Sequence, residues 1–596
     1  MIRSGLSATF LLVTLLPAQT VTYVDAGATG NNDGSSWSNA YTSLQMALSN
    51  AAAGEVWIAR GVYRPAPANG DRASSFVLKN GLSVFGGFAG SETKRSERDP
   101  AQNPVVLSGD LNGDDGSAWT NMGDNSYNVV RCAGLGMGTV VEGITITAGR
   151  ALPTTWGAGI QVTGGNLTLR NCVVERNISG WAGGIGATSA GTILLEDCRV
   201  SGNMAWLGRG AGVHIDKSGS LVLRHCHFDH NDAVGGGTTQ GVGGAVYLGF
   251  TTSLEATDCV FETNTALYQF PPTTYPSEGG AICALGGSFA IDRCQFIGNQ
   301  ATSGGAIYTY RDGVVRNCLF DANQAIRQND IGGNAGAIFI AGSAGLTIDG
   351  CTFYGNEGTE DVGGVWANKL KDTWITNSIF WANKDRHGTV SETSVKGGKY
   401  AYLCVQNMLV ARLGEDPIDP KKFPNCTDKD PQFVDADGPD NRAGTLDDDF
   451  RLMMVSPCVD TGDLAATLRG LDVGGMPRLL DGKLDGKLAL DMGAHEFANL
   501  TLRETRGATT TRIDLDGNTA LLTVLFLGAE GTPLLVQPFG EFWIDLLKPM
   551  LVLPVGAIPA QLTFPLPASP LTLEAQALGF TTAMHGAVSN PIPLRF

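Results

Sequence analysis

Charged side chains are scarce in this sequence, in which Asp, Glu, Lys and Arg make up 17% of the 596 residues. Basic residues are the scarcer kind, with 41 Lys and Arg against 58 Asp and Glu and a formal net charge of −17. Because nucleic-acid binding needs a basic surface, this balance argues against a nucleic-acid partner. Sustained helical periodicity is also missing inside the repeat described below, which argues against a helical solenoid.

Long apolar runs are missing as well, apart from a short one at the start. Residues 1–19 combine Arg3 with an apolar stretch from Phe10 to Leu16, and Ala18 or Gln19 offers a cleavage point, as in an export signal. No later run reaches 18 apolar residues, the length that a membrane helix needs. We therefore expect a secreted or cell-surface protein without a transmembrane segment after cleavage.

Glycine is abundant, with 80 residues, about twice the usual share, which favours tight turns and stacked strands. Between residues 167 and 383 one pattern recurs eight times: an apolar strand, Cys-x-Phe-x-x-Asn, a variable gap, and Gly-Gly-Ala-Ile or a close variant. The first column of the repeat is Cys172, Cys198, Cys226, Cys259, Cys294, Cys318, Cys351 and Ser378. The second is Val174, Val200, Phe228, Phe261, Phe296, Phe320, Phe353 and Phe380. The third is Asn177, Asn203, Asn231, Asn264, Asn299, Asn323, Asn356 and Asn383.

A period of this length indicates a solenoid, and the residue types indicate which kind. The Cys and Phe columns are two residues apart, so on a strand both point into the same interior. Asn suits a corner, because it tolerates the left-handed conformation and its amide can bond along the axis. The pattern predicts an all-β, parallel β-helix whose equivalent residues stack from coil to coil.

The twelve cysteines have two interpretations. A column of buried thiols fits their apolar surroundings, whereas disulfides between coils would demand a particular torsion. We expect thiols in the column. Cys404 and Cys426 lie outside it and could pair, and the state of Cys458 is left open.

The repeats resemble those of polymorphic outer membrane proteins within the pectin-lyase-like β-helix superfamily. The clearest matches are Gly279-Gly280-Ala281-Ile282 and Gly304-Gly305-Ala306-Ile307, with Phe296 to Asn299 between them. This resemblance implies a right-handed β-helix and an extracellular setting.

Both ends of the predicted helix carry their own signals. Residues 20–64 resemble the N-terminal cap of bacterial β-helix repeat proteins. A capping helix is expected from Ser38 or Asn39 to Ala53, ended by Gly54, with Leu44, Ala47, Leu48 and Ala51 on its apolar face. SerProCysValAspThrGly (456–462) and AspMetGlyAlaHisGlu (491–496) resemble the closing segment of choice-of-anchor Q proteins. We therefore predict a β-helix over 20–497 that includes a closing segment at 400–497. Residues 498–596, rich in short apolar strands with Gly and Pro turns, are expected to form a β-sandwich.

The gap between Asn and Gly-Gly is the variable part of each coil, so all insertions leave from one corner, and solenoids often bind there. Beside this corner lies a column of outward positions rich in aromatic residues. The candidate ligand-binding residues are Trp156, Trp181, Trp206, His214, Tyr247, Tyr308, Phe339 and Trp366. Their rings could stack on sugars, or the loops could cover them as a second small core.

A polar column is the other candidate site. Asp197, His225 and Asp258 each precede a column Cys, and His227 points outward nearby. These four are the candidate catalytic residues, as an acid–base pair or a metal site. The alternative is a solvated ladder of opposite charges.

Two acidic loops could hold calcium through oxygen ligands. Asp110-x-Asn112-x-Asp114 begins like an EF-hand loop but lacks the glycine at the sixth place. The second loop offers Asp435, Asp437, Asp440, Asp447, Asp448 and Asp449. Hydrated turns would explain both loops equally well.

Three functions remain open at this stage. The loop corner favours binding of an extracellular polysaccharide or another cell-surface component. The alternatives are a polysaccharide lyase or glycoside hydrolase and a structural surface protein. The Asn-Thr-Asp and Arg-Ile-Lys signatures of galacturonan hydrolases are missing, and fold alone gives no activity. The oligomeric state is not indicated.

Overall fold

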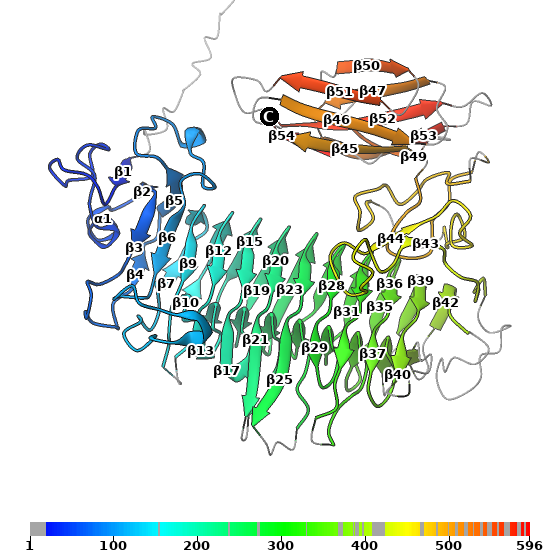
Figure 1. Cartoon of the computed structure of the whole chain (residues 1–596), viewed down its shortest axis with the longest axis horizontal. Helices are drawn as coiled ribbons and strands as arrows, with labels where there is room; N and C mark the ends of the chain where they lie inside the picture. Colours follow the sequence, from blue (N-terminus) through cyan, green and yellow to red (C-terminus); the bar gives the residue numbers. More distant parts are fainter. Residues whose placement is uncertain are drawn as a thin grey trace, which may run out of the picture.

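A computed structural model describes residues 20–152, 155–236, 239–270, 275–328, 330–367, 373–385, 387, 393–395, 399–407, 424–464, 470–483, 485 and 487–498, and the strands between 500 and 595 by their backbone pairing. The expected export signal at 1–19 lies outside these residues. The described chain is nearly all β, and its strands stack coil upon coil as parallel ribbons along one axis (Figure 1).

Each coil contributes up to four strands, which form four rows named here after their residues or position. The Ile row is β4 (Phe76–Leu78), β7 (Val130–Leu135), β10 (Ile160–Gly165), β14 (Ile185–Thr188), β18 (Val213–Ile215), β22 (Val246–Leu248), β26 (Ile282–Ala284), β30 (Ile307–Thr309), β34 (Ile338–Ile340), β38 (Val365–Ala367) and β41 (Thr393–Val395). The corner row is β13 (Ile178–Trp181), β17 (Met204–Arg209), β21 (Asp232–Gly236), β25 (Thr265–Phe270), β29 (Gln300–Ala301), β33 (Gln324–Ala325), β37 (Glu357–Gly358) and β40 (Lys384–Asp385).

The other two rows share the long strand β39 (Trp374–Trp381) and so form one 23-stranded sheet. The Leu row is β1 (Val21–Val24), β2 (Gly54–Ala59), β5 (Leu82–Phe88), β8 (Val140–Glu142), β11 (Leu167–Arg170), β15 (Thr192–Glu196), β19 (Gly219–Arg224), β23 (Thr252–Thr257), β27 (Phe289–Asp292), β31 (Gly313–Arg316), β35 (Leu346–Asp349) and β42 (Lys399–Val405). The Phe row is β3 (Gly61–Tyr63), β6 (Val105–Ser108), β9 (Thr145–Thr147), β12 (Val173–Glu175), β16 (Arg199–Ser201), β20 (His227–Asp229), β24 (Val260–Glu262), β28 (Gln295–Ile297), β32 (Leu319–Asp321) and β36 (Thr352–Tyr354).

The predicted columns stack in register. Phe228 to Phe380 are all buried, and neighbouring rings lie parallel with centroids 4.5 to 5.1 Å apart. The seven column cysteines are buried free thiols beside them, and Ser378 continues the column by accepting a bond from the Cys351 amide. Cys404, Cys426 and Cys458 are likewise thiols rather than disulfides, so the suggested Cys404–Cys426 disulfide is absent from the described residues.

The Asn column forms a continuous amide ladder inside the wall of the helix. Every member is fully buried, and from Asn177 to Asn356 each Nδ2 donates to the Oδ1 of the Asn in the next coil over 2.8 to 3.1 Å. The same Nδ2 also donates to a backbone carbonyl of the preceding coil, as Asn264 does to Phe228 at 2.9 Å. The ladder therefore satisfies polar groups that the corner would otherwise bury unpaired.

The N-terminal helix α1 (Leu44–Asn50) is shorter than expected. Ser43 caps it by accepting from the Met46 amide, whereas Asn39 belongs to a preceding turn in which its amide donates to Ser36. Gly54 begins β2 rather than ending the helix. The expected apolar face is confirmed, because Leu44, Ala47 and Leu48 are buried in the same core as the first coils. The helix thus covers the open end of the tube, where bare strand edges would invite pairing (Figure 1).

The closing segment includes the hairpin of β43 (Phe433–Asp435) and β44 (Asp449–Leu452). Leu319 of β32 packs with Phe450 and Ala494 of this segment, so the segment lies against the Phe row (Figure 1). After it, all the paired strands are antiparallel. They are β45 (Leu500–Arg506), β46 (Thr510–Gly517), β47 (Leu522–Gly528), β48 (Glu530–Val536), β49 (Gly540–Ile544), β50 (Leu551–Gly556), β51 (Ala560–Pro565), β52 (Thr572–Phe580), β53 (Gly586–Val588) and β54 (Ile592–Arg595). That these strands form a separate β-sandwich domain stays a prediction.

Candidate functional site

The aromatic column beside the loop corner exists as a column. Its register runs from Gln161 through Gly186, His214, Tyr247, Cys283, Tyr308 and Phe339 to Trp366, one residue per coil of the Ile row. Most of it faces no solvent. His214 is fully buried, and Tyr247 and Tyr308 are 2% and 4% exposed. These three rings therefore form a second small core under the corner, and the expectation that they face a ligand is wrong for this structure.

The corner loops produce this burial. Trp156 packs on His214 at 4.6 Å and on Trp181 at 5.0 Å, and the missing side chain of Gly186 leaves room for the backbone of the adjoining Gly157. Burial lowers the pKa of His214 to about 3, so the ring stays neutral and its Nδ1 faces the Arg209 carbonyl. Coverage by loops, which a coil-by-coil pattern does not show, decides the role of these rings.

The three tryptophans do not form one stack. Trp156 and Trp181 are paired across neighbouring coils, but a register shift in β17 brings Arg209, not Trp206, beside Trp181. The Arg209 guanidinium lies 5.8 Å from the Trp181 ring and 5.6 Å from the Tyr247 ring. Trp206 projects elsewhere and is 40% exposed. The even spacing of the three tryptophans in the sequence does not place them in one stack, because β17 contains an irregularity in its register.

The ring stack reaches the surface at its far end. Tyr308, Phe339 and Trp366 stack in parallel, with centroid separations of 5.0 and 4.3 Å. Phe339 and Trp366 are only partly buried, and the register partner of Trp366 in the next coil is Ser394. The stack of rings therefore ends at Trp366, which retains exposed aromatic surface.

Glu278 is a buried acid that the sequence pattern did not single out. It lies at the same corner, 6% exposed, with the Tyr308 hydroxyl and the Cys283 thiol as partners. Burial raises its pKa to about 7, against the opposing effects of Tyr308, Cys283 and Arg209. A corner position next to Gly-Gly is the signal that could have indicated it.

Replacing Glu278 with glutamine should make stability less dependent on pH. The raised pKa means that the folded state disfavours the ionised acid, so its stability contribution falls as pH rises from about 4.5 towards 7. The neutral variant escapes this loss, and its unfolding free energy should exceed that of the wild type by on the order of 3 kcal/mol above pH 8. Urea unfolding at pH 5 and pH 8 measures the difference, and a variant that is weaker at pH 8 would contradict the prediction.

The polar column is a ladder of charges on the outside of the corner between the Leu and Phe rows. His225 lies between Asp197 and Asp258, with ring nitrogens 3.8 and 3.5 Å from their carboxylates. Arg293 of the next coil holds Asp258 through two bonds of 2.7 and 2.8 Å, and His227 meets Glu262 at 3.0 Å. The sequence thus correctly places these side chains together. Alternating charges in solvent account for the arrangement, which matches the ladder interpretation more closely than a catalytic one.

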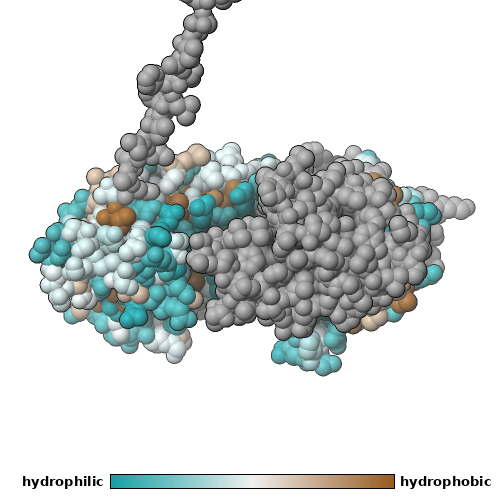
Figure 2. All heavy atoms as spheres, turned by 90° about the horizontal axis from the view of Figure 1, so that it is seen from above, coloured by the Kyte–Doolittle hydropathy of each residue, from teal (hydrophilic) through white to brown (hydrophobic). Residues whose placement is uncertain are grey.

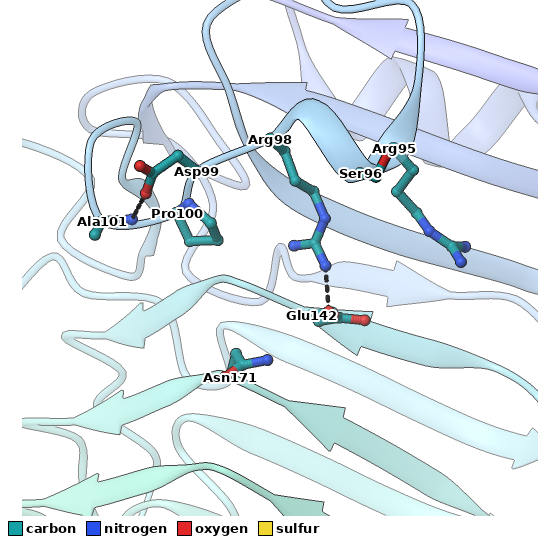
Figure 3. A pocket seen from close by; sticks show the side chains of 8 residues that line it. All are labelled: Arg95, Ser96, Arg98, Asp99, Pro100, Ala101, Glu142 and Asn171. Carbon is teal, nitrogen blue, oxygen red and sulfur yellow. Dashed lines mark hydrogen bonds and ion pairs between the residues drawn. The ribbon is translucent and has the colours of Figure 1, made fainter. Parts of the chain in front are cut away.

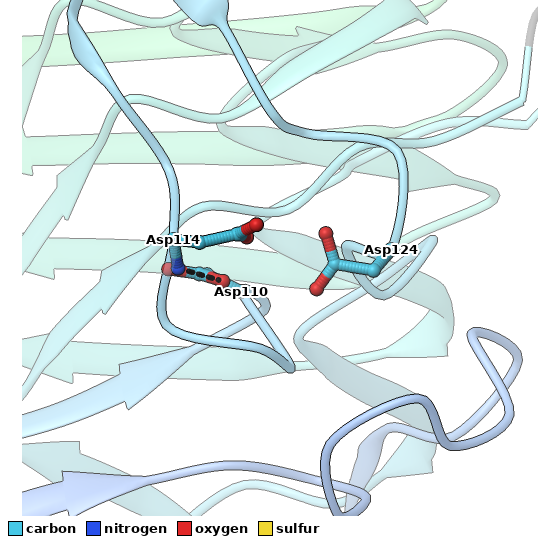
Figure 4. Close-up of side chains that lie close together, drawn as sticks. All are labelled: Asp110, Asp114 and Asp124. Atoms are coloured by element: carbon cyan, nitrogen blue, oxygen red, sulfur yellow. Dashed lines mark hydrogen bonds between the residues drawn. The ribbon is translucent and has the colours of Figure 1, made fainter.

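Asp110, Asp114 and Asp124 bring three carboxylate oxygens within 4.8 Å of one another, and their side chains converge in one loop region (Figure 4). Asp110 already accepts from the Gly113 and Asp114 amides, and Asp124 accepts from Asn112. These bonds to backbone amides hold the loop in shape and account for the convergence of the three acids.

In the second acidic loop, most of the six carboxylates are held by local partners. Asp449 pairs with Arg451, Asp440 accepts from the Arg442 amide and Asp447 accepts from Thr445. In the register of the β43–β44 hairpin, Asp435 lies opposite Asp449. Burial, and then the neighbouring Asp437, raise the pKa of Asp435. Asp448 faces Asp321 on the helix wall.

A hollow of about 800 Å³ lies near the N-terminal end, beneath the short 3-10 helix Arg95–Glu97. Figure 3 shows Arg98 reaching Glu142 across it, and Arg95 pairs with Glu55 at 2.6 Å. Each guanidinium group is therefore paired with a carboxylate, that of Arg98 largely buried and that of Arg95 on a side chain that is half exposed. Its lining residues are Arg95, Ser96, Arg98, Asp99, Pro100, Ala101, Glu142 and Asn171.

Two family models match parts of the coiled region. The family described as "Right handed beta helix region" matches residues 136–296, and the "Chlamydia polymorphic membrane protein (Chlamydia_PMP) repeat" matches residues 293–310. Metabotropic glutamate receptor-like protein R of Dictyostelium discoideum is 24% identical over 214 residues, which is 32% of this chain and 13% of that protein. The match thus spans only a small part of the relative. The crystal structure of pectate lyase Pel9A aligns with 14% identity and a TM-score of 0.41, over 80% of this chain and 96% of that one.

The family matches cover the first five members of the Cys, Phe and Asn columns, from Cys172 to Asn299. A β-helix with repeats of this type indicates a surface or secreted protein. In the part of the chain that the structure describes, no helix has the length and apolar character to cross a membrane. The chain is therefore a right-handed parallel β-helix protein that carries a repeat of the polymorphic membrane protein type.

Proposed function

We propose that this protein is a secreted or cell-surface protein that binds an extracellular polysaccharide at the exposed end of the corner aromatic stack. The observation that carries the proposal is the pair Phe339 and Trp366, whose parallel rings are partly exposed beside the variable loops. A flat aromatic surface offers a sugar ring an apolar face at little entropic cost, because the stack already fixes the rings.

The surroundings support a binding role. Glu360, 28% exposed in its side chain, belongs to the loop between β37 and β38, and it pairs with Arg327 from the preceding coil at 2.6 Å. Polar groups beside an apolar platform can orient hydroxyl groups by hydrogen bonds. On the face seen from above, the coloured part of the described surface is mostly white to teal, with small separate apolar patches (Figure 2).

Replacing Trp366 with alanine should weaken retention on the polysaccharide that the wild type binds by roughly tenfold, or about 1.4 kcal/mol. A panel of immobilised polysaccharides, followed by affinity electrophoresis in the best one, measures this. Trp374→Ala is the matched control, because Trp374 is 47% exposed on the Leu row, away from the corner, and its loss should change nothing.

Equal retention of both variants would contradict the assignment to the corner. Retention of the wild type by no polysaccharide would favour the structural alternative. Release of unsaturated uronides or new reducing ends from the same panel would instead favour the lyase or hydrolase alternative.

A further inference from the structure

One buried carboxylate on the wall of the helix lacks the partner that burial demands. Asp321 follows Phe320 in β32, so its side chain points out of the tube, yet it is 0% exposed because the closing segment covers it. Neither of its oxygens has a hydrogen-bond partner among the described residues. Buried polar groups are nearly always hydrogen-bonded, and an unpaired buried carboxylate is costly.

The same position three coils earlier shows what a satisfied carboxylate looks like. Asp229 ends β20 as Asp321 ends β32, and it is 2% exposed. Arg199 holds it through two bonds of 2.8 Å, and Ser201 and His230 add two more. Although burial alone would raise the pKa of Asp229, these partners lower it to about 2. Position in the coil therefore does not force Asp321 to be unpaired.

What faces Asp321 is another acid, Asp448 of the loop 435–449. Burial, and then this neighbouring carboxylate, raise the pKa of Asp321 well above its usual range. Within the described residues, neither Asp321 nor Asp448 forms an ion pair with a basic side chain. Asp437 also lies close enough to act, with Asp321 and Asp448, on the nearby Tyr354 hydroxyl.

The loop is built to hold Asp448 at this place. Its Oδ2 accepts from the Gly444 amide at 2.7 Å and from the Thr445 amide at 3.2 Å. Gly444 has a φ of 89°, and a β-carbon there would lie 2.7 Å from the Ala322 β-carbon, so only glycine lets the loop approach the wall this closely. The two acids are thus brought together by packing that reaches across more than a hundred residues.

From this geometry we infer that a divalent cation with the oxygen preference of calcium binds between Asp321 and Asp448 and fastens the closing segment to the Phe row. The two carboxylates supply up to four oxygens, and water can complete the six to eight that calcium takes. Tyr354 and Asp437 lie in the same region. The cation provides Asp321 with the positive charge that Arg199 provides to Asp229.

Calcium titration of the full-length protein, stripped with a chelator and followed by calorimetry, tests the inference. Asp321→Asn and Asp448→Asn should each bind one calcium ion fewer than the wild type. Asp440→Asn is the matched control, because Asp440 is an exposed acid of the same loop, and it should keep the full number. Counting the loss makes the test independent of any ion held by Asp110, Asp114 and Asp124.

A second measurement leaves the ligating acids intact. Terbium replaces calcium at oxygen sites and emits when a nearby tyrosine absorbs, so Tyr354→Phe should remove part of the sensitised emission while the protein stays folded. Unchanged calcium stoichiometry in both Asn variants, together with unchanged emission in Tyr354→Phe, would overturn the cation. The buried Asp321 carboxyl would then stay protonated without a cation. Because burial raises its pKa, the wild type should in that case lose stability as pH rises above about 4, with or without calcium, and Asp321→Asn should not.

Discussion

Replacing Asn264 with alanine should lower the free energy of unfolding by about 4 to 6 kcal/mol, one of the two largest effects we expect from a single substitution. The side chain takes part in four bonds of the ladder. Its Nδ2 donates to the Phe228 carbonyl at 2.9 Å and to Asn299 at 3.0 Å. Its Oδ1 accepts from the side chain and the backbone amide of Asn231, at 2.9 and 3.2 Å.

Alanine would remove these four bonds in a wall in which every ladder residue is 0% exposed, so water cannot replace them. The Asn231 Nδ2 would keep its bond to the Val200 carbonyl and the Asn299 Oδ1 its bond from the Asn264 amide, but the Asn231 backbone amide would lose its partner. Each lost bond costs about 1 kcal/mol, and a stranded buried group costs more. Urea unfolding followed by tryptophan fluorescence gives the change. Asn80→Ala is the control, because Asn80 is exposed and accepts a single bond from Gly136. A loss at Asn264 no larger than that at Asn80 would show that the ladder is incidental.

Phe296→Ala should cost about 4 to 5 kcal/mol for a different reason. The ring is fully buried in the middle of the stack, 4.9 Å from Phe261 and 4.8 Å from Phe320. Truncation opens a cavity that rigid coils on both sides cannot close, and it removes two stacking contacts worth about 0.5 to 1.5 kcal/mol each. Phe296→Leu, which keeps most of the volume, should cost about half as much.

The control for this prediction is Phe250→Ala, because Phe250 is 64% exposed and should change stability by no more than about 0.5 kcal/mol. Hydrogen exchange adds a spatial readout. In a solenoid each coil contacts only its neighbours, so protection should fall first in the coils that flank Phe296. A uniform loss over the whole helix would contradict the picture of nearest-neighbour stacking.

The interior of this protein could be predicted from its sequence because the interior is periodic. Cys294, Phe296 and Asn299 repeat at fixed spacing, and a strand that pairs in register with its copy must place equal side chains one above another. The same logic gave the aromatic column from His214 to Trp366 and the contact of His225 with Asp197 and Asp258. Local bulges broke it, as at β17, where Arg209 took the place expected for Trp206.

The burial and exposure of the candidate site residues depend on contacts outside the repeating sequence pattern. Whether Tyr247 is exposed depends on corner loops of unequal length, and whether Asp321 is buried depends on a segment more than a hundred residues further on. The Ala494 amide donates to Thr352 over a separation of 142 residues, and the Asp463 amide donates to Asn377 over 86. The repeating pattern of the sequence does not predict such contacts.

The amino-acid sequence by itself therefore determined the tube: the strand rows, the stacked Phe and Cys columns and the Asn ladder, because in-register pairing turns a linear period into a column. Only the tertiary structure decided which of the side chains that point out of the tube remain exposed to solvent. That choice depends on which irregular segment lies over each face of the tube, and long-range packing, rather than the pattern of any coil, sets it.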